Sequence, residues 1–187
     1  VTGMVPRGAP LAYSGGVSRR RRLPRDAASL DMSWLIPDGQ WGVHVLVAVA
    51  AFSITGLVVL IHYEGLHALA RRYSGRAPSR DRRVMLKIIF ALLALHIVEI
   101  WCYGLTFWAL LQVPDTGFVH GEHAVDNVFD TIYLSATTYT TLGLGDLAPV
   151  GAIRLLSGME SLTGFLLVTW SASFTYLEMS RYWRREN

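Results

Sequence analysis

A run of residues without any Asp, Glu, Lys or Arg, from position 43 to position 62, constrains this chain more than any other feature. Its length matches the roughly 20 helical residues that cross the hydrocarbon core of a bilayer, which is about 30 Å thick. Two further apolar segments, 88–113 and 152–176, are long enough for the same role. Because the 52% of hydrophobic residues are concentrated in these segments, the sequence predicts three transmembrane helices rather than an ordinary soluble domain.

The stretch between the second and third apolar segments is too short, and too polar at its start, to be a further crossing. It can only enter the membrane and return, which is tolerated where the backbone is buried in protein or lines a water-filled path. The end of this stretch is the heptad Thr140-Thr141-Leu142-Gly143-Leu144-Gly145-Asp146. Gly143 and Gly145 can adopt φ > 0 at little steric cost, so consecutive carbonyls can point at one axis. A ring of such carbonyls replaces the water around a cation, and the heptad therefore predicts an ion-selectivity filter.

The heptad resembles the filter of the potassium channel pore family, which is usually written T-V-G-Y-G-D. The resemblance extends over roughly residues 88–176, within which 126–139 is similar to the family's pore helix. Pro149, Arg154 and Gly164 fall near the outer-mouth proline, a basic residue and the inner-helix glycine of that family. Alone, the heptad could be a Thr/Gly turn in any loop, but the flanking segments favour the filter.

This resemblance implies an all-α membrane protein with a re-entrant pore helix and filter loop between its second and third transmembrane helices. One chain contributes one filter strand and a closed ring needs four, so a homotetramer is expected. Potassium ions would bind at the filter carbonyls only, with no cofactor, no other metal and no enzymatic activity. The expected filter residues are Thr141, Leu142, Gly143, Leu144 and Gly145.

Two residues of the heptad depart from the family pattern. Leu142 stands where valine is commonest, and Leu144 stands where an aromatic residue is usual. Leucine offers no hydroxyl group or ring edge to brace the filter from behind, so the sequence predicts cation permeation more firmly than strict selectivity for potassium over sodium. A weakly selective monovalent cation channel, a nonconducting membrane scaffold and a modifying channel subunit remain alternatives.

Residues around the filter are expected to support it. By resemblance, Tyr133 would hydrogen-bond the carboxylate of Asp146, although Tyr133 could instead be a packing residue and Asp146 a solvated charge. Thr137 stands where some channels carry a buried acid, so that coupling is absent. Asp126 and Asn127 are good N-cap residues for the pore helix. The other end of that helix carries roughly half a negative charge, which would attract a cation at the pore centre.

The third apolar segment is expected to line the inner cavity. Gly164 is a candidate gating hinge, because glycine weakens a helix by about 1 kcal/mol relative to alanine. Equally, Gly158 and Gly164 could allow close approach of neighbouring helices, as small residues do in membranes. The sequence leaves the hinge and the packing roles open.

The ionisable residues inside the apolar segments include His96, Glu99 and Glu160. An acid at the centre of a spanning helix costs about 2.5–3.5 kcal/mol unless it finds a partner or water, so these side chains should face protein. A structural polar cluster on the back of the pore helix is the expected arrangement, with a proton-sensing gate and a membrane enzyme as alternatives. The hydroxyl partners expected for the cluster are Ser135, Thr137 and Thr138.

Charge is distributed unevenly between the connections. The link 64–87 is rich in Arg, whereas 114–130 holds four acids and no Lys or Arg. By the positive-inside rule the link 64–87 and the C-terminus are cytoplasmic, in the plasma (cell inner) membrane. Flanking apolar segments favour a membrane surface over nucleic acid as the partner of this basic link. The candidate contacts for anionic lipid are Arg71, Arg72, Arg82 and Arg83.

Domain boundaries follow from these features. Residues 1–31 are rich in Gly, Pro, Ser and Arg without periodicity, which predicts disorder. Their arginines oppose the topology above, so we expect an upstream extension, with the working protein beginning at or near Met32. The expected order is then a peripheral helix (32–63), a basic link (64–87), a pore domain (88–176) and a tail (177–187).

His120 and His123 could confer external sensitivity to pH or divalent metals, or could simply be solvated.

Overall fold

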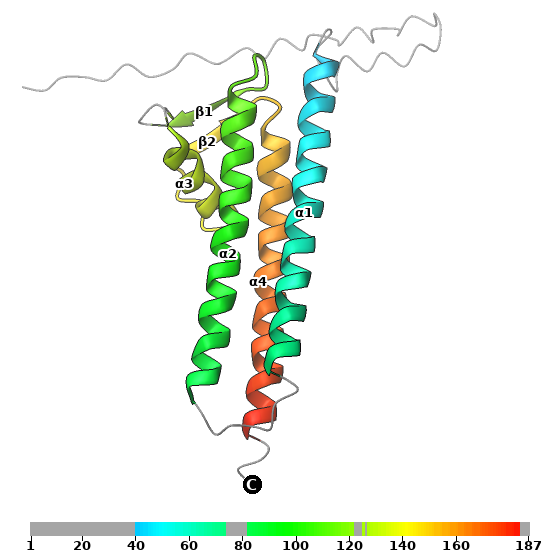
Figure 1. Cartoon of the computed structure of the whole chain (residues 1–187). Helices are drawn as coiled ribbons and strands as arrows, with labels where there is room; N and C mark the ends of the chain where they lie inside the picture. Colours follow the sequence, from blue (N-terminus) through cyan, green and yellow to red (C-terminus); the bar gives the residue numbers. More distant parts are fainter. Residues whose placement is uncertain (1–39, 74–81, 122–124, 126, 184–187) are drawn as a thin grey trace, which may run out of the picture. The chain divides into compact units, whose positions relative to one another are not determined.

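The computed structural model describes residues 40–73, 82–121, 125 and 127–183, and this part of the chain is mostly helical (Figure 1). Four helices and two short strands follow one another along it. They are α1 (Trp41–Tyr73), α2 (Arg82–Leu111), β1 (Phe118–Gly121), α3 (Val128–Tyr139), β2 (Leu147–Val150) and α4 (Arg154–Trp183). The expected extension 1–31 lies outside the described residues.

Two of these helices, α1 and α2, are long and apolar enough to cross a membrane by length and composition. Helix α4 has 30 residues, but its composition is less apolar. The reason lies in the Ser, Thr and Glu residues spaced along it, which include the buried Glu160, Thr163 and Ser171. The structure therefore supports two of the three expected membrane spans, and the third stays a prediction.

The helices run further than the apolar segments do. Helix α1 continues from residue 62 to Tyr73, α2 begins at Arg82, and α4 continues beyond residue 176 to Trp183. The predicted link 64–87 and tail 177–187 are thus partly helical. Burial of Leu66 against Ile88 and Leu92 extends the contact between α1 and α2 past the charge-free run. Charge does not end the helix, because arginines in a last turn interact favourably with its dipole.

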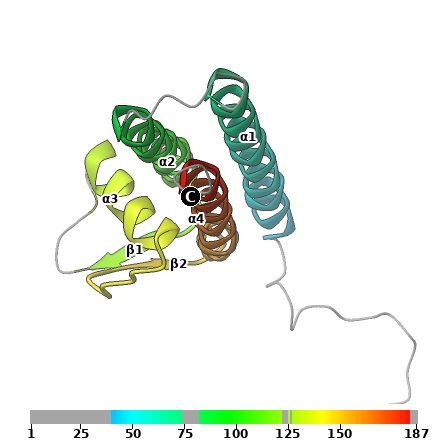
Figure 2. The same cartoon turned by 90° about the horizontal axis from the view of Figure 1, so that it is seen from below.

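Helices α2 and α4 lie side by side, with α1 on one side of the pair and α3 on the other (Figure 2). All four helices contribute to one apolar core, and the buried residues on α1 recur at helical spacing. The largest buried apolar side chains of this core are Tyr103, Phe107, Leu134, Tyr139, Ile153, Leu156 and Leu167.

Strands β1 and β2 form an antiparallel pair with Phe118 opposite Val150 and Gly121 opposite Leu147. The expectation of an all-α chain missed this pair. It forms because Gly117 adopts φ 130, where a Cβ atom would stand 2.0 Å from the carbonyl oxygen of Val150. The pairing joins the two ends of the segment that connects α2 with α4, and α3 and the heptad lie between these ends along the chain.

Candidate ion-conduction site

Helix α3 has a well-formed N-terminus. Asn127 is the N-cap: its Oδ1 accepts hydrogen bonds from the backbone N–H groups of Phe129 (2.8 Å) and Asp130 (3.1 Å). The Asp130 carboxylate accepts in return from the Asn127 N–H (3.3 Å), which completes a capping box. The expected cap at Asn127 is confirmed, whereas Asp126 lies outside the described residues. Capping satisfies donors that a helix N-terminus otherwise leaves open.

The heptad after α3 alternates in backbone handedness. Thr141, Gly143 and Gly145 have φ of 56, 52 and 84°, whereas Leu142 and Leu144 have no positive φ. Alternation was expected from the glycines, but the positive φ of Thr141 was not. Such alternation is the condition under which successive peptide planes can present carbonyls to one side.

Three backbone hydrogen bonds anchor the heptad to the end of α3, the first of them from the Thr140 N–H to the Ala136 carbonyl (3.2 Å). The Thr141 N–H donates to the Thr138 carbonyl (2.9 Å), and the Gly143 N–H donates to the Thr137 carbonyl (3.2 Å). Thr137 thus supports the heptad through its backbone, because its hydroxyl group donates to the Leu134 carbonyl within α3 (2.9 Å). Beyond these anchors the heptad is exposed, with 63% of Leu142 accessible.

A side-chain contact ties the far end of the heptad back to α3. The Tyr133 hydroxyl donates a hydrogen bond to Oδ2 of Asp146 at 2.7 Å, as the resemblance implied. This hydrogen bond to a carboxylate raises the pKa of Tyr133. Both ends of the heptad are therefore fixed to the same short helix, one by backbone and one by side chain.

In a comparison with known protein families, residues 88–179 match a family model described as ion channel. Over these residues, just under half of the chain, the sequence is similar to that ion channel family. The matched segment holds nearly all of α2, both strands, α3, the heptad and most of α4, whereas α1 precedes it. No curated protein and no solved structure matches the chain. Together with the two apolar helices, the family indicates a membrane protein.

Gly164 is a point of close packing between α4 and α3. A Cβ atom there would stand 2.2 Å from the carbonyl oxygen of Tyr139, the last residue of α3. At Gly158, by contrast, a Cβ atom would meet nothing within 4 Å. Of the two roles left open for Gly164, the structure therefore favours close approach of α4 to α3.

The polar residues expected inside the membrane fall into two groups rather than one. Glu160 lies against the Ser135 hydroxyl of α3, as expected for a polar contact on the back of the pore helix. Ser135 also contacts the carbonyl of Ile100 on α2 (2.8 Å). Oε2 of Glu160 has no hydrogen-bond partner among the described residues.

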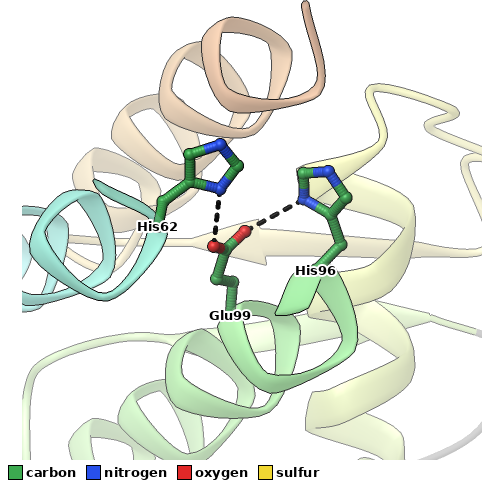
Figure 3. A group of neighbouring side chains, drawn as sticks. All are labelled: His62, His96 and Glu99. Carbon is green, nitrogen blue, oxygen red and sulfur yellow. Dashed lines mark hydrogen bonds and ion pairs between the residues drawn. The ribbon is translucent and has the colours of Figure 1, made fainter. Parts of the chain in front are cut away.

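The second group surrounds Glu99 and includes a residue that the sequence analysis missed. Oε1 of Glu99 lies 2.9 Å from Nδ1 of His62, a fully buried residue of α1. Oε2 lies 3.0 Å from Nδ1 of His96 (Figure 3). Oε2 also contacts the Tyr139 hydroxyl. The available signal was the spacing of His62, four residues before Leu66 and four after Val58, which places a polar side chain on the buried stripe of α1.

Three of the candidate lipid contacts can be located. Arg71 and Arg72 lie exposed in the last turn of α1, and Arg83 lies exposed in the first turn of α2. The side chain of Arg82 and the whole of His123 lie outside what the structure describes, and His120 is exposed on β1.

Proposed function

We propose that this chain is the subunit of a homotetrameric potassium channel in which Thr141–Gly145 forms the selectivity filter. The observation that carries this proposal is the alternating φ at Thr141, Gly143 and Gly145, in a segment anchored to a capped pore helix. Four such strands around one axis would surround a dehydrated cation with carbonyl oxygens. Conduction is passive and single-file along the electrochemical gradient, without cofactor or covalent chemistry.

The exposed surface of the pore segment supports a tetramer. Phe129 on α3 is 71% exposed, and Leu162 and Phe165 on α4 are 70% and 63% exposed. These residues belong to the part of the chain that carries the filter, where neighbouring subunits would have to meet. The C-terminal end of α3 would then point its partial negative charge toward the shared axis, which favours a cation there.

The proposed topology places the end of α1, the start of α2 and the end of α4 in the cytoplasm. These three helix ends lie together, and α3 lies toward the opposite end of the helices (Figure 1). Arg71 and Arg72 lie at the end of α1 and Arg83 lies at the start of α2, which fits the positive-inside rule. Anionic lipid would bind there with about 1 kcal/mol for each Lys or Arg near the surface.

A weakly selective cation channel is the second candidate, and the composition of the heptad favours it. Leu142 and Leu144 carry no group that can hydrogen-bond to the surrounding protein, so the filter is held only by its backbone bonds and by Tyr133. Reversal potentials in mixed potassium and sodium solutions separate the two candidates: a large shift toward the potassium potential supports strict selectivity, and a small shift supports the second.

Replacement of Gly143 with Asp tests the pore itself. At φ 52 any side chain is strained, and four added carboxylates at the filter would bind cations too tightly for conduction, so thallium flux into proteoliposomes should fall to the background. Gly42→Asp is a matched control, because Gly42 lies at the start of α1 where a Cβ atom meets nothing within 4 Å. Unchanged flux in the Gly143 variant, with normal membrane insertion, would refute the assignment of the filter.

A further inference from the structure

Three residues of the type that binds metals converge at the contact between α1 and α2. His62, His96 and Glu99 each offer a ligand atom, and these atoms all lie within 4.8 Å of one another (Figure 3). The side chains of His62 and Glu99 are fully buried, and that of His96 is 16% exposed. The group therefore lies inside the protein rather than on a solvated acidic surface.

Both imidazole rings present the same nitrogen, Nδ1, to Glu99. Nδ1 of His62 and Nδ1 of His96 face Glu99, at 2.9 and 3.0 Å from its oxygens. Nε2 of His96 lies 3.1 Å from the hydroxyl oxygen of Ser171, and Nε2 of His62 lies 3.5 Å from it. One serine on α4 thus receives the outer nitrogens of two histidines from two other helices.

Neutral histidines cannot satisfy all of these contacts at once while Glu99 is ionised. A neutral imidazole carries one N–H. If both Nδ1 atoms are protonated, the single Ser171 proton must serve two Nε2 acceptors. If either Nε2 is protonated instead, the lone pair of that ring's Nδ1 faces a carboxylate oxygen at 2.9 or 3.0 Å. One additional positive charge between the rings and the carboxylate removes the mismatch.

We infer that His62, His96 and Glu99 bind a divalent transition-metal ion of the zinc class, through both Nδ1 atoms and one carboxylate oxygen. Both Nε2–H groups then donate to the two lone pairs of Ser171, which is the outer contact that metal-bound histidines generally make. Neutral imidazole and carboxylate suit zinc and its neighbours, and this site is chemically distinct from a potassium site of carbonyl oxygens.

Ligands about 2.0–2.1 Å from zinc stand about 3.3 Å apart at tetrahedral angles. The two Nδ1 atoms lie 2.9 and 3.0 Å from separate oxygens of Glu99, Oε1 and Oε2, and the ligand atoms of the three residues lie within 4.8 Å of one another. Rotation of the three side chains by up to about 1.5 Å would bring both Nδ1 atoms and one oxygen to these ligand spacings. The Tyr139 hydroxyl, 3.0 Å from Nδ1 of His96, lies beside the remaining coordination position. The metal would fasten α1 to α2 directly behind the last residue of the pore helix.

Metal content of the purified full-length chain tests this inference. The protein is isolated with a histidine-free tag and without chelating resin, and zinc is measured by elemental analysis. We expect about one zinc ion per chain, as for a site with three protein ligands. His62→Ala and His96→Ala should each lower the zinc content at least tenfold. His67→Ala is the control and should leave the zinc content unchanged. His67 lies on α1, as His62 does, but it is exposed, and the ring contact it makes is with Tyr63.

Cobalt substitution supplies a measurement that does not depend on variants that fold. Cobalt(II) added to the metal-stripped wild-type protein should produce the intense visible absorption of a tetrahedral site, and zinc should abolish it. A wild-type protein that retains no stoichiometric zinc and gives no such band would overturn the inference, and the extra charge would then be a proton. Because neither readout involves ion flux, failure here leaves the channel proposal standing, and loss of flux leaves the metal site standing.

Discussion

Replacement of Gly164 with alanine separates a packing role from a hinge role. The added methyl group would lie 2.2 Å from the carbonyl oxygen of Tyr139 and 2.9 Å from its carbonyl carbon. Those atoms are backbone and cannot rotate away as the end of a flexible side chain could. Tyr139 is also held from the other side, since its hydroxyl contacts both Glu99 and His96. The methyl group can therefore be accommodated only if α4 and α3 move apart.

The expected size of the effect follows from two opposing contributions. Overpacking in a well-packed core costs about 1–3 kcal/mol, and contact with rigid backbone places this position at the upper end. Alanine in place of glycine within a helix returns about 1 kcal/mol. Gly164→Ala should therefore lower the free energy of unfolding by about 2 kcal/mol. Gly158→Ala is the matched control: it has the same helix gain, its Cβ atom meets nothing within 4 Å, and it should be neutral or stabilising.

Unfolding in mixed micelles by titration with a denaturing detergent, followed by circular dichroism, measures both variants. Thallium flux on the same preparations reports the effect on the pore. A hinge at Gly164 predicts the opposite pattern. Stiffening of α4 by Gly164→Ala would raise the free energy of unfolding as Gly158→Ala does, and the two variants would differ only in flux. If the two variants unfold with the same free energy, or Gly164→Ala is the more stable, the packing argument is refuted.

Two further substitutions test single contacts of α3. Tyr133→Phe removes the hydrogen bond to Asp146. Because the position is exposed, the free energy of unfolding should change by less than about 0.5 kcal/mol, while potassium flux or selectivity falls. Unaltered flux and reversal potential would show that the bond does not support the filter. Glu160→Gln should be tolerated and Glu160→Ala should lose about 1–3 kcal/mol of unfolding free energy, measured by the same detergent titration. The single Ser135 proton cannot serve both the Ile100 carbonyl and Glu160, so a neutral side chain that can donate fits this position; equal losses in the two variants would contradict that reading.

The parts of the site that could be predicted are those fixed by local sequence. Asn127 was identified as a cap because capping depends on residues within one turn of it. The Tyr133–Asp146 contact followed from the family resemblance of the heptad, and the glycines at 143 and 145 indicated the positive φ that they adopt. The apolar segments located the three long helices, but not their ends, because Leu66 packs against α2 beyond the first apolar segment.

The parts that could not be predicted depend on contacts between distant segments. His62 is 37 residues from Glu99 along the chain, and only the packing of α1 on α2 brings them together. The pairing of β1 with β2 likewise needs the ends of the re-entrant segment to be held by α2 and α4. The role of Gly164 required the position of the Tyr139 carbonyl. The spacing of residues in the sequence indicates which residues share a face of one helix or strand. It does not indicate which helices and strands contact one another.

The position of the proposed filter depends on more than the helices of the matched family segment. Thr141, its first residue, is bonded to Thr138 of α3, so any displacement of the end of α3 would be carried directly into the first carbonyls. That end is held by Tyr139, whose hydroxyl contacts Glu99, and Glu99 in turn is held by His62 of α1. Helix α1 lies outside residues 88–179, yet without it Glu99 would lose a buried partner, which generally costs a buried charge several kcal/mol. It follows that α1 helps to fix the geometry on which ion binding would depend.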